Sequence, residues 1–394
     1  MIFLDFRSIL AEKSVFFNRD ALSPHFIPDK IMYREKEIEK IMRSITPLFH
    51  NKRPRNIFLY GKPGTGKTSS IKYITKQFVQ VPSNGRILYI NCRMYSSRYK
   101  ILQKITSDLI SFAKNGFAPS VFYEKILGWV EEGQRYLVIV LDEIDMVKDL
   151  DELLYTLTRA NDDLKSGGVS LVGISNRLEF KKKLDPRSKS SLLETEIVFP
   201  PYDSEQLRGI LNQRINIGFY EGICEDSAIN LAAAIAARET GDARYALKLL
   251  LYAGEISDER KDKKITHTHV EMARKAVEED IVLEAISTLP EQQQLILHAL
   301  ALLTMKGSKY SKLSDESDSM FLSGELYESY ADVCKNMRRE RRSARWCKEY
   351  IRELESLGLV QTVESGKGIR GHSTLIRLNY SPQKIKKAVE ELMV

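Results

Sequence analysis

The feature that most constrains this chain is a glycine-rich run, Gly61-Lys62-Pro63-Gly64-Thr65-Gly66-Lys67-Thr68, which follows an apolar stretch at residues 56–60. A segment with helical periodicity comes next, so the run has the strand, loop and helix context of a phosphate-binding loop. Glycines let several backbone N–H groups turn inward, and the start of the following helix adds positive potential. The run therefore predicts a nucleoside triphosphate site.

The positions of this loop have distinct expected roles. Lys67 reaches the outer phosphates, and Thr68 offers a hydroxyl to Mg²⁺. The residues predicted to contact the cofactor here are Gly61, Gly64, Thr65, Gly66, Lys67, Thr68 and Ser69. The alternative is a glycine turn that merely starts a helix, and the preceding strand makes this alternative the weaker one.

A second apolar run, residues 136–141, ends in Asp142-Glu143. A buried parallel strand presents side chains at its C-terminal edge, so both carboxylates are expected near the phosphate loop. Asp142 would hold Mg²⁺ together with Thr68, and Glu143 would orient or deprotonate the attacking water. The alternative is an acidic helix cap, and Asp145 is interpreted as such a cap or as a surface group.

The composition is that of a soluble globular protein with two or three domains, since 43% of the 394 residues are hydrophobic and 29% are charged. No run approaches the roughly 20 apolar residues that a membrane-spanning helix needs. We therefore expect a cytoplasmic protein without membrane contact. The four cysteines contain no C-x-x-C pair and are interpreted as reduced thiols, and His267-Thr268-His269 as surface or packing residues rather than metal ligands.

Residues 1–200 are expected to form an α/β domain with a parallel sheet covered by helices. Its predicted strands lie at residues 56–60, 86–91, 137–141, 169–175 and 196–199. Pro200-Pro201 ends this pattern, and residues 201–278 show helical periodicity, which predicts a small helical lid. The third expected unit, residues 279–394, contains a Ser-rich loop at 307–324 and a closing β-hairpin.

Most of the net charge of +7 lies in one segment of the third unit. Residues 335–348 carry seven basic residues and one acid, a net of +6. A compact basic cluster on a nearly neutral protein indicates contact with a polyanion, and a solvated charged face is the alternative.

The cluster continues into a predicted helix at residues 341–357 that has a basic face and an opposite packing face. Two strand-like segments, 359–363 and 375–378, flank a cationic loop and predict a hairpin. Helices followed by such a hairpin indicate a winged helix, with the basic helix in the DNA major groove and the hairpin loop on phosphates or the minor groove. The predicted DNA-binding residues are Arg341, Arg342, Arg345, Lys348, Arg352, Lys367 and Arg370.

Together these motifs resemble, from end to end, the archaeal AAA+ replication initiators of the origin-recognition type, which are related to the eukaryotic origin-recognition complex and its helicase-loading partner. The more specific matching segments are Ile31-Met32-Tyr33-Arg34-Glu35, Gly173-Ile174-Ser175-Asn176, Leu184-Asp185-Pro186-Arg187, Phe199-Pro200-Pro201-Tyr202, Gly241-Asp242-Ala243-Arg244-Tyr245-Ala246-Leu247 and Ser323-Gly324-Glu325-Leu326-Tyr327. The resemblance implies an α/β AAA+ core, an all-helical lid and a C-terminal winged-helix domain.

The resemblance also implies roles for five further residues. Asn176 looks like the sensor-1 residue near the γ-phosphate, and Arg244 like the sensor-2 arginine of the lid. Arg187 resembles an arginine finger that completes a neighbouring subunit's site, with a surface salt bridge as the alternative. Tyr202 and Arg214 match positions that touch the nucleotide where core and lid meet, although Tyr202 could equally be a packing aromatic. The expected catalytic set is Lys67, Asp142, Glu143, Asn176 and Arg187.

The function that this resemblance implies is ATP-dependent replication initiation on duplex origin DNA, with ATP or ADP and Mg²⁺ as cofactors. Because the nucleotide would contact the core through Lys67 and the lid through Arg244, exchange of ATP for ADP would reorient them. The resemblance thus implies a weak ATPase that acts as a switch. It further implies the replicative helicase and paralogous initiator subunits as partners, association with the nucleoid, and a DNA-contacting insertion between Cys92 and Gln134.

Two other functions stay open at this point. The first is a DNA-remodelling or clamp-loading ATPase, whose basic helix would be a general DNA tether. The second is a transcription regulator in which the winged helix reads promoters and the ATPase core signals.

Overall fold

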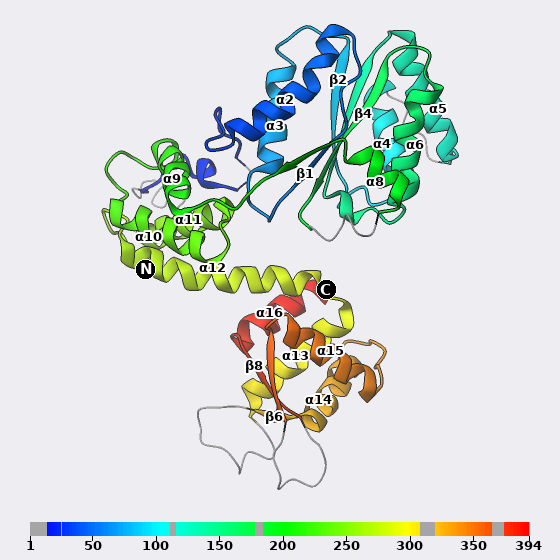
Figure 1. Ribbon diagram of the computed structural model, residues 1–394. Coiled ribbons are helices and arrows are strands. Elements are labelled where there is room, and N and C mark those ends of the chain that lie inside the picture. The colour runs from blue at the N-terminus through cyan, green and yellow to red at the C-terminus, as the bar shows by residue number, and fades with distance from the viewer. Residues whose placement is uncertain are drawn as a thin grey trace, which may run out of the picture. The chain divides into compact units, whose positions relative to one another are not determined.

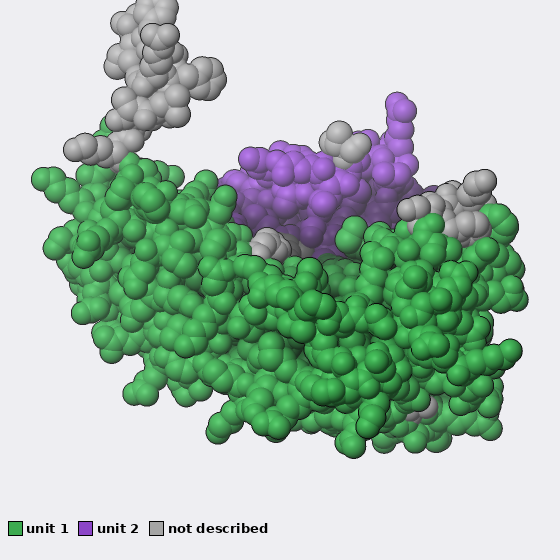
Figure 2. All heavy atoms as spheres, turned by 90° about the horizontal axis from the view of Figure 1, so that it is seen from above, with its two compact units in different colours: residues 1–273 green, residues 274–394 purple. Residues whose placement is uncertain are grey.

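The computed structural model of the protein describes residues 14–24, 26–110, 116–177, 184–307, 320–364 and 374–393. The chain forms two compact units, residues 1–273 and 274–394 (Figure 2). Lys367, Arg370 and most of the Ser-rich loop lie outside the described residues. The division falls inside helix α12, His267–Thr288, which also contains residue 279, where we expected the third unit to begin.

Unit 1 is built on a five-stranded parallel sheet with the strand order β2-β3-β4-β1-β5. The strands are β1 (Ile57–Tyr60), β2 (Gly85–Asn91), β3 (Tyr136–Asp142), β4 (Gly168–Ser175) and β5 (Thr195–Val198). All five strands predicted from the apolar runs are present, each within one residue of its expected bounds. The register pairs Asn91 with Asp142, so the C-terminal ends of β2 and β3 bring polar side chains to one edge.

Helices cover both faces of this sheet (Figure 1). On one face, α2 (Glu35–Ile45) and α3 (Lys67–Phe78) pack on alternate strand residues such as Val138 and Val140. The other face receives α4 (Arg98–Ile110), α5 (Pro119–Glu132), α6 (Leu150–Asp163) and α8 (Pro186–Leu192). Because both faces are buried, β3 is apolar at every position until Asp142, which is what parallel sheets require.

The helical lid follows Pro200-Pro201 within the same unit. Its helices are α9 (Ser204–Gly218), α10 (Asp226–Glu239), α11 (Ala243–Arg260) and the first part of α12. Asp203 and Gln206 form a capping box that starts α9. The short 3₁₀ helix η1 (Arg19–Leu22) packs on α9 and α11, so this part of the N-terminal segment contacts the lid although it lies within the range expected for the core.

Unit 2 has winged-helix architecture, as predicted. Helices α13 (Glu291–Lys306), α14 (Ser323–Asn336), α15 (Ala344–Ser356) and α16 (Pro382–Met393) pack with a three-stranded antiparallel sheet of order β6-β8-β7. The hairpin strands are β7 (Val360–Glu364) and β8 (Thr374–Leu378). A third strand, β6 (Phe321–Leu322), lies in the segment expected to be a loop. In the described part of the chain, the helices are too short or too polar to span a bilayer.

Candidate functional site

The phosphate-binding loop connects β1 to α3, as predicted, and its conformation depends on glycine at two positions. Gly64 and Gly66 have φ values of +69° and +92°, which residues with a Cβ rarely adopt. A Cβ on Gly64 would overlap the carboxylate of Asp242, and one on Gly66 would lie 2.6 Å from the hydroxyl oxygen of Tyr202. Both glycines therefore let the loop approach residues that belong to the lid or adjoin it.

Lys67 is the first residue of α3, and its side chain is almost completely buried. Its Nζ donates hydrogen bonds of 2.8 Å to the carbonyl oxygens of Gly61 and Lys62. Burial lowers the pKa of the Lys67 amine to about 8, and the nearby Asp142 carboxylate partly opposes that shift. The amine is thus held at the loop, where a phosphate oxygen could replace the carbonyl oxygens as acceptor.

Asp142 ends β3, and its carboxylate accepts three hydrogen bonds. Oδ2 accepts from the Thr68 hydroxyl at 2.7 Å and from the Tyr89 hydroxyl at 2.6 Å, and Oδ1 accepts from the Glu143 backbone N–H at 3.0 Å. Hydroxyl and carboxylate oxygens are the ligands that Mg²⁺ prefers. Thr68 and Asp142, already in contact, therefore form a donor set that fits this ion.

Glu143 follows Asp142 with a φ of +54°, an uncommon value for a residue other than glycine. Its Oε2 is buried and has no hydrogen-bond partner within the described parts of the structure. A buried carboxylate oxygen without a donor costs free energy unless water or a ligand supplies one. Glu143 lines the cavity described below together with Asp142.

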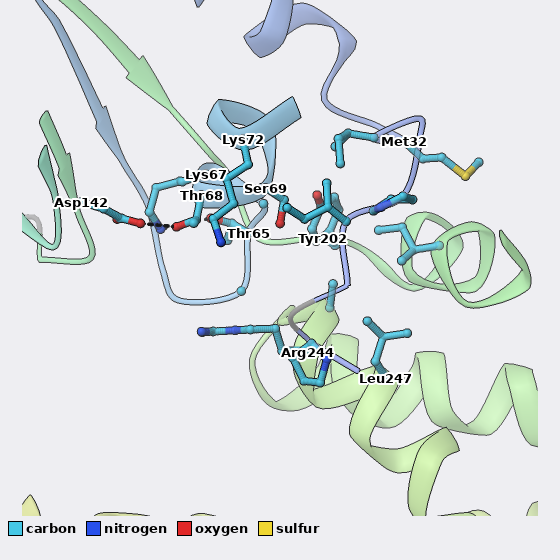
Figure 3. A pocket seen from close by; sticks show the side chains of 18 of the residues that line it. Met32, Thr65, Lys67, Thr68, Ser69, Lys72, Asp142, Tyr202, Arg244 and Leu247 are labelled. Atoms are coloured by element: carbon cyan, nitrogen blue, oxygen red, sulfur yellow. Dashed lines mark hydrogen bonds between the residues drawn. The ribbon is translucent and has the colours of Figure 1, made fainter. Parts of the chain in front are cut away.

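These residues surround a cavity of about 300 Å³ that also reaches the lid. In Figure 3, Lys67, Thr68 and Asp142 lie on one side of this space, and Arg244 extends toward it from α11. The predicted site residues that line the cavity are Gly64, Thr65, Gly66, Lys67, Thr68, Ser69, Asp142, Glu143, Asn176, Tyr202, Arg214 and Arg244. The volume lies at the lower end of the range typical of small-molecule sites.

Arg244 lies in the first turn of α11 and is held by Asp242, the N-cap residue of that helix. The Asp242 carboxylate accepts a hydrogen bond from the Arg244 backbone N–H at 2.7 Å and forms an ion pair of 3.2 Å with its guanidinium. The backbone N–H of Ala243 donates to the carbonyl oxygen of Gly64 at 3.2 Å. The start of α11 therefore touches the phosphate-binding loop directly.

Asn176 is exposed just beyond β4 and lines the cavity. The residue before it, Ser175, donates a hydrogen bond of 2.9 Å from its hydroxyl to Asp145 Oδ1. Asp145 was interpreted as a cap or a surface group, and this was wrong, since only 6% of its side chain is exposed. Asp145 instead connects the C-terminal ends of β3, which ends at Asp142, and of β4, which ends one residue before Asn176.

The buried guanidinium of Arg34 links the loop to the start of the lid, a role that sequence reasoning missed. Its Nε donates to the carbonyl oxygen of Thr65 at 2.8 Å, and Nη2 donates to that of Pro200 at 2.5 Å. The same group lies over the ring of Tyr202, which is buried. Arg34 belonged to a segment matched to the family, but its residue type alone gave no signal of these contacts.

Arg214 lines the cavity, yet its N–H groups bind the N-terminal segment. Nη1 donates to the carbonyl oxygen of Ala21 at 3.1 Å and Nη2 to that of Phe26 at 2.9 Å, and the group lies over the Phe26 ring. Arg214 thus links the N-terminal segment to α9 through these hydrogen bonds. The sequence gave no sign of this contact, because the residues involved lie more than 180 positions apart.

Two other predicted residues are not brought to the cavity wall. Gly61 precedes the part of the loop that lines it, although its carbonyl oxygen accepts a hydrogen bond from Lys67. Arg187 is exposed in the first turn of α8, which Asp185 caps by accepting from the backbone N–H groups of Arg187 and Ser188. The Arg187 side chain therefore does not contribute to the wall of its own chain's cavity.

The basic helix of unit 2 is α15, and it begins at Ala344 rather than at residue 341. Arg341 and Arg342 therefore precede the helix, and the Arg341 guanidinium lies over the Tyr327 ring of α14. The helix starts only after Ser343, which has an extended conformation and is the N-cap residue. Arg345, Lys348 and Arg352 are exposed on α15.

The opposite face of α15 packs as predicted. Cys347, Ile351 and Leu354 are buried in the core of unit 2, and Tyr350 is partly buried against it. One face of the helix is thus packed in the core of unit 2, and the basic side chains lie on the other, exposed face. All four cysteines are free thiols, in agreement with the sequence interpretation.

Comparison with protein families gives three matches along the chain. An AAA domain matches residues 50–181, a Cdc6 AAA+ ATPase-type lid domain matches residues 208–275, and a CDC6 C-terminal winged helix domain matches residues 284–388. The three matches follow the order of core, lid and winged helix.

Relatives similar over nearly the full length are known in archaea. An ORC1-type DNA replication protein of Pyrococcus horikoshii is 39% identical, over 97% of this chain and 91% of the relative. ORC1-type DNA replication protein 1 of Archaeoglobus fulgidus is 36% identical, over 98% and 93%. The solved structure of the Aeropyrum pernix ORC1 protein in complex with DNA has a TM-score of 0.78 at 32% identity, covering 96% of this chain and 98% of that one.

Proposed function

The chain belongs to the ORC1-type DNA replication proteins, and on this premise we propose that it binds ATP or ADP with Mg²⁺ between core and lid, and duplex origin DNA through its winged helix. Its family makes it an AAA+ ATPase and a replication initiator. The observation that carries the proposal is the convergence of Lys67, Thr68 and Asp142 from the core with Arg244 from the lid on one cavity.

In the proposed site, the residues of the core bind the phosphates and position water. Lys67 and the loop N–H groups hold the outer phosphates, while Asn176 donates to the γ-phosphate or the water. Thr68 and Asp142 hold Mg²⁺, which when bound would neutralise charge developing on the transferred phosphoryl group. Glu143 orients the attacking water, and its unpartnered Oε2 supports this assignment.

The nucleotide acts as a switch through its contacts with both parts of the site. Arg244 is held by Asp242 beside the loop, and a γ-phosphate would compete for its guanidinium. ATP and ADP therefore contact the lid differently, which shifts its position relative to the core. A weak ATPase suffices for such a switch. Arg187, exposed and away from its own cavity, is proposed to act on the site of a neighbouring initiator subunit.

DNA binding is proposed for the basic face of α15 with the two arginines that precede it. The ORC1 protein of Aeropyrum pernix, solved in complex with DNA, shares the whole architecture and supports this assignment. Arg345, Lys348 and Arg352 would face the major groove, and Arg341 and Arg342 the phosphates. Lys367 and Arg370 remain proposed contacts of the hairpin loop. Recruitment of the replicative helicase and association with the nucleoid also belong to this proposal.

Genome-wide footprinting of the protein on its host's DNA, beside a Lys67→Ala variant, tests the proposal. We expect a few sharp sites next to duplex-unwinding regions, with an altered footprint in the variant. Sites spread over promoters would instead favour a transcription regulator. Diffuse coverage would favour a remodelling or clamp-loading ATPase, and either result would overturn the initiator assignment.

A further inference from the structure

Tyr89 is a residue of the site to which neither the motifs nor the family matches give a role. It lies in β2, two residues before Asn91, and Asn91 pairs with Asp142 of β3. Side chains at alternate positions of a strand share one face, and paired residues of neighbouring strands point the same way. Tyr89, Asn91 and Asp142 therefore face the same side, and all three line the cavity.

The hydroxyl of Tyr89 reaches Asp142 diagonally across the two strands. It donates to Oδ2 at 2.6 Å, and the Thr68 hydroxyl donates to the same oxygen at 2.7 Å. With the Glu143 N–H on Oδ1, these bonds fix both oxygens of the carboxylate. Thr68 lies at the start of α3, whereas Tyr89 lies in the sheet, so of these two donors Tyr89 is the one that ties Asp142 to a neighbouring strand.

Packing holds the Tyr89 ring in place. The ring is half-buried against the core between the sheet and helices α2 and α3. The Nζ of Lys72, one turn beyond the loop on α3, lies 5.6 Å from the ring centre. A ring held in this way gives the hydroxyl a defined position, which is what a group that orients another side chain needs.

We propose that Tyr89 is a positioning residue for the magnesium site: it fixes the Asp142 carboxylate in the orientation that receives Mg²⁺ beside Thr68. The inference rests on the proposed nucleotide function. Groups that hydrogen-bond to metal-binding side chains commonly change metal affinity by 10–100-fold when they are removed. Without the phenol, Asp142 would keep its charge but lose one of the donors that fix its oxygens.

The test measures magnesium binding rather than turnover. A fluorescent ATP analogue is bound to the full chain, first in EDTA and then with increasing Mg²⁺, and the half-saturating Mg²⁺ concentration is recorded for each variant. For Tyr89→Phe we expect this concentration to rise about tenfold, with nucleotide affinity in EDTA unchanged. Tyr136→Phe is the matched control, because it removes a hydroxyl that donates to the Asn51 carbonyl at the opposite end of the sheet.

A second comparison separates positioning from general loosening of the sheet. In an Asp142→Asn background, adding Tyr89→Phe should cause no further rise, because the two residues act through one contact. Three results would overturn the inference. The half-saturating Mg²⁺ concentration could rise tenfold when Tyr89→Phe is added to Asp142→Asn. It could be unchanged in Tyr89→Phe alone, or it could rise as much in Tyr136→Phe as in Tyr89→Phe. If the wild-type chain itself shows no Mg²⁺-dependent binding of the analogue, the proposed nucleotide function falls, and the role of Tyr89 with it.

Discussion

The guanidinium of Arg34 lies 3.8 Å from the centre of the Tyr202 ring, and this contact joins the phosphate-binding loop to the beginning of the lid. Arg34 also donates to the carbonyl oxygens of Thr65 in the loop and Pro200 before the lid. The buried guanidinium of Arg34 therefore contacts both the loop that would hold the phosphates and the segment about which the lid would move.

Replacement of Arg34 by methionine should destabilise unit 1 and weaken nucleotide binding. The substitution removes the donor from three carbonyl oxygens, those of Tyr33, Thr65 and Pro200, and each such loss costs about 1–3 kcal/mol when the group is buried. We expect the free energy of unfolding, measured by urea titration of the full chain, to fall by about 3 kcal/mol.

Arg43→Met is the matched control for Arg34→Met. Arg43 is 78% exposed on α2 and forms an ion pair with Glu39 one turn earlier, an i,i+4 pair of the kind worth a few tenths of a kcal/mol. Its replacement should change stability by less than about 0.5 kcal/mol. Equal effects of the two substitutions would contradict the linking role of Arg34.

Lys67→Ala should abolish ATP binding or turnover while leaving much of the DNA affinity. The amine is the buried cation of the loop, whereas the proposed DNA contacts belong to unit 2. Titration with ATP and with duplex DNA measures the two separately. Lys62→Ala removes an equal charge from an exposed position in the same loop and should retain ATP affinity. Normal nucleotide affinity and hydrolysis in Lys67→Ala would contradict the site.

The stability of unit 2 should fall in acid because of His298. Its pKa is lowered by burial, with Glu390 opposing the shift and Lys386 adding to it. Below the ordinary histidine pKa of about 6.5, the unfolded chain takes up a proton that the folded chain does not. The free energy of unfolding contributed by this group therefore falls as pH drops below that value, by up to about 1.4 kcal/mol per pH unit.

His298→Leu should make the stability of unit 2 less dependent on pH between about 6.5 and 5. Fluorescence of Trp346 in a Trp129→Phe background follows the unfolding of this unit in urea. His267→Leu, which replaces an exposed histidine, should leave the slope unchanged. If His298→Leu and its parent lose stability equally in acid, then another group is responsible.

The strands could be predicted from the sequence because helices cover both faces of the sheet, which requires uninterrupted apolar runs such as residues 136–141 of β3. The loop could be predicted because its glycines and Lys67 are local in sequence. The contact between Tyr89 and Asp142 could not, since it joins positions 53 residues apart and requires knowing that β2 lies beside β3. Tyr89 itself is an ordinary residue for a strand.

The two errors at α15 and Asp145 also have physical explanations. The helical periodicity of the basic residues continues through Arg341, but Ser343 was available as an N-cap signal and marks the actual start. Asp145 follows an acidic turn whose local sequence resembles a cap, whereas its burial depends on Ser175 and Arg177 at the end of another strand. The local sequence pattern around Asp145 cannot show which side chains of a distant segment will contact it.

Arg345→Ala should weaken duplex DNA binding by roughly 1–3 kcal/mol and relax sequence preference, if Arg345 contacts a base edge. Arg345 is exposed in the first turn of α15, and the recognition helix of such folds contacts bases with its N-terminal residues. Affinity is measured at several salt concentrations for the preferred site and for a scrambled one. Lys387→Ala, which removes an exposed charge from α16 in the same unit, should have a smaller effect that is equal for both DNAs. A uniform loss across both DNAs with a shallower salt slope would make Arg345 a phosphate contact instead, and unchanged binding would remove it from the interface.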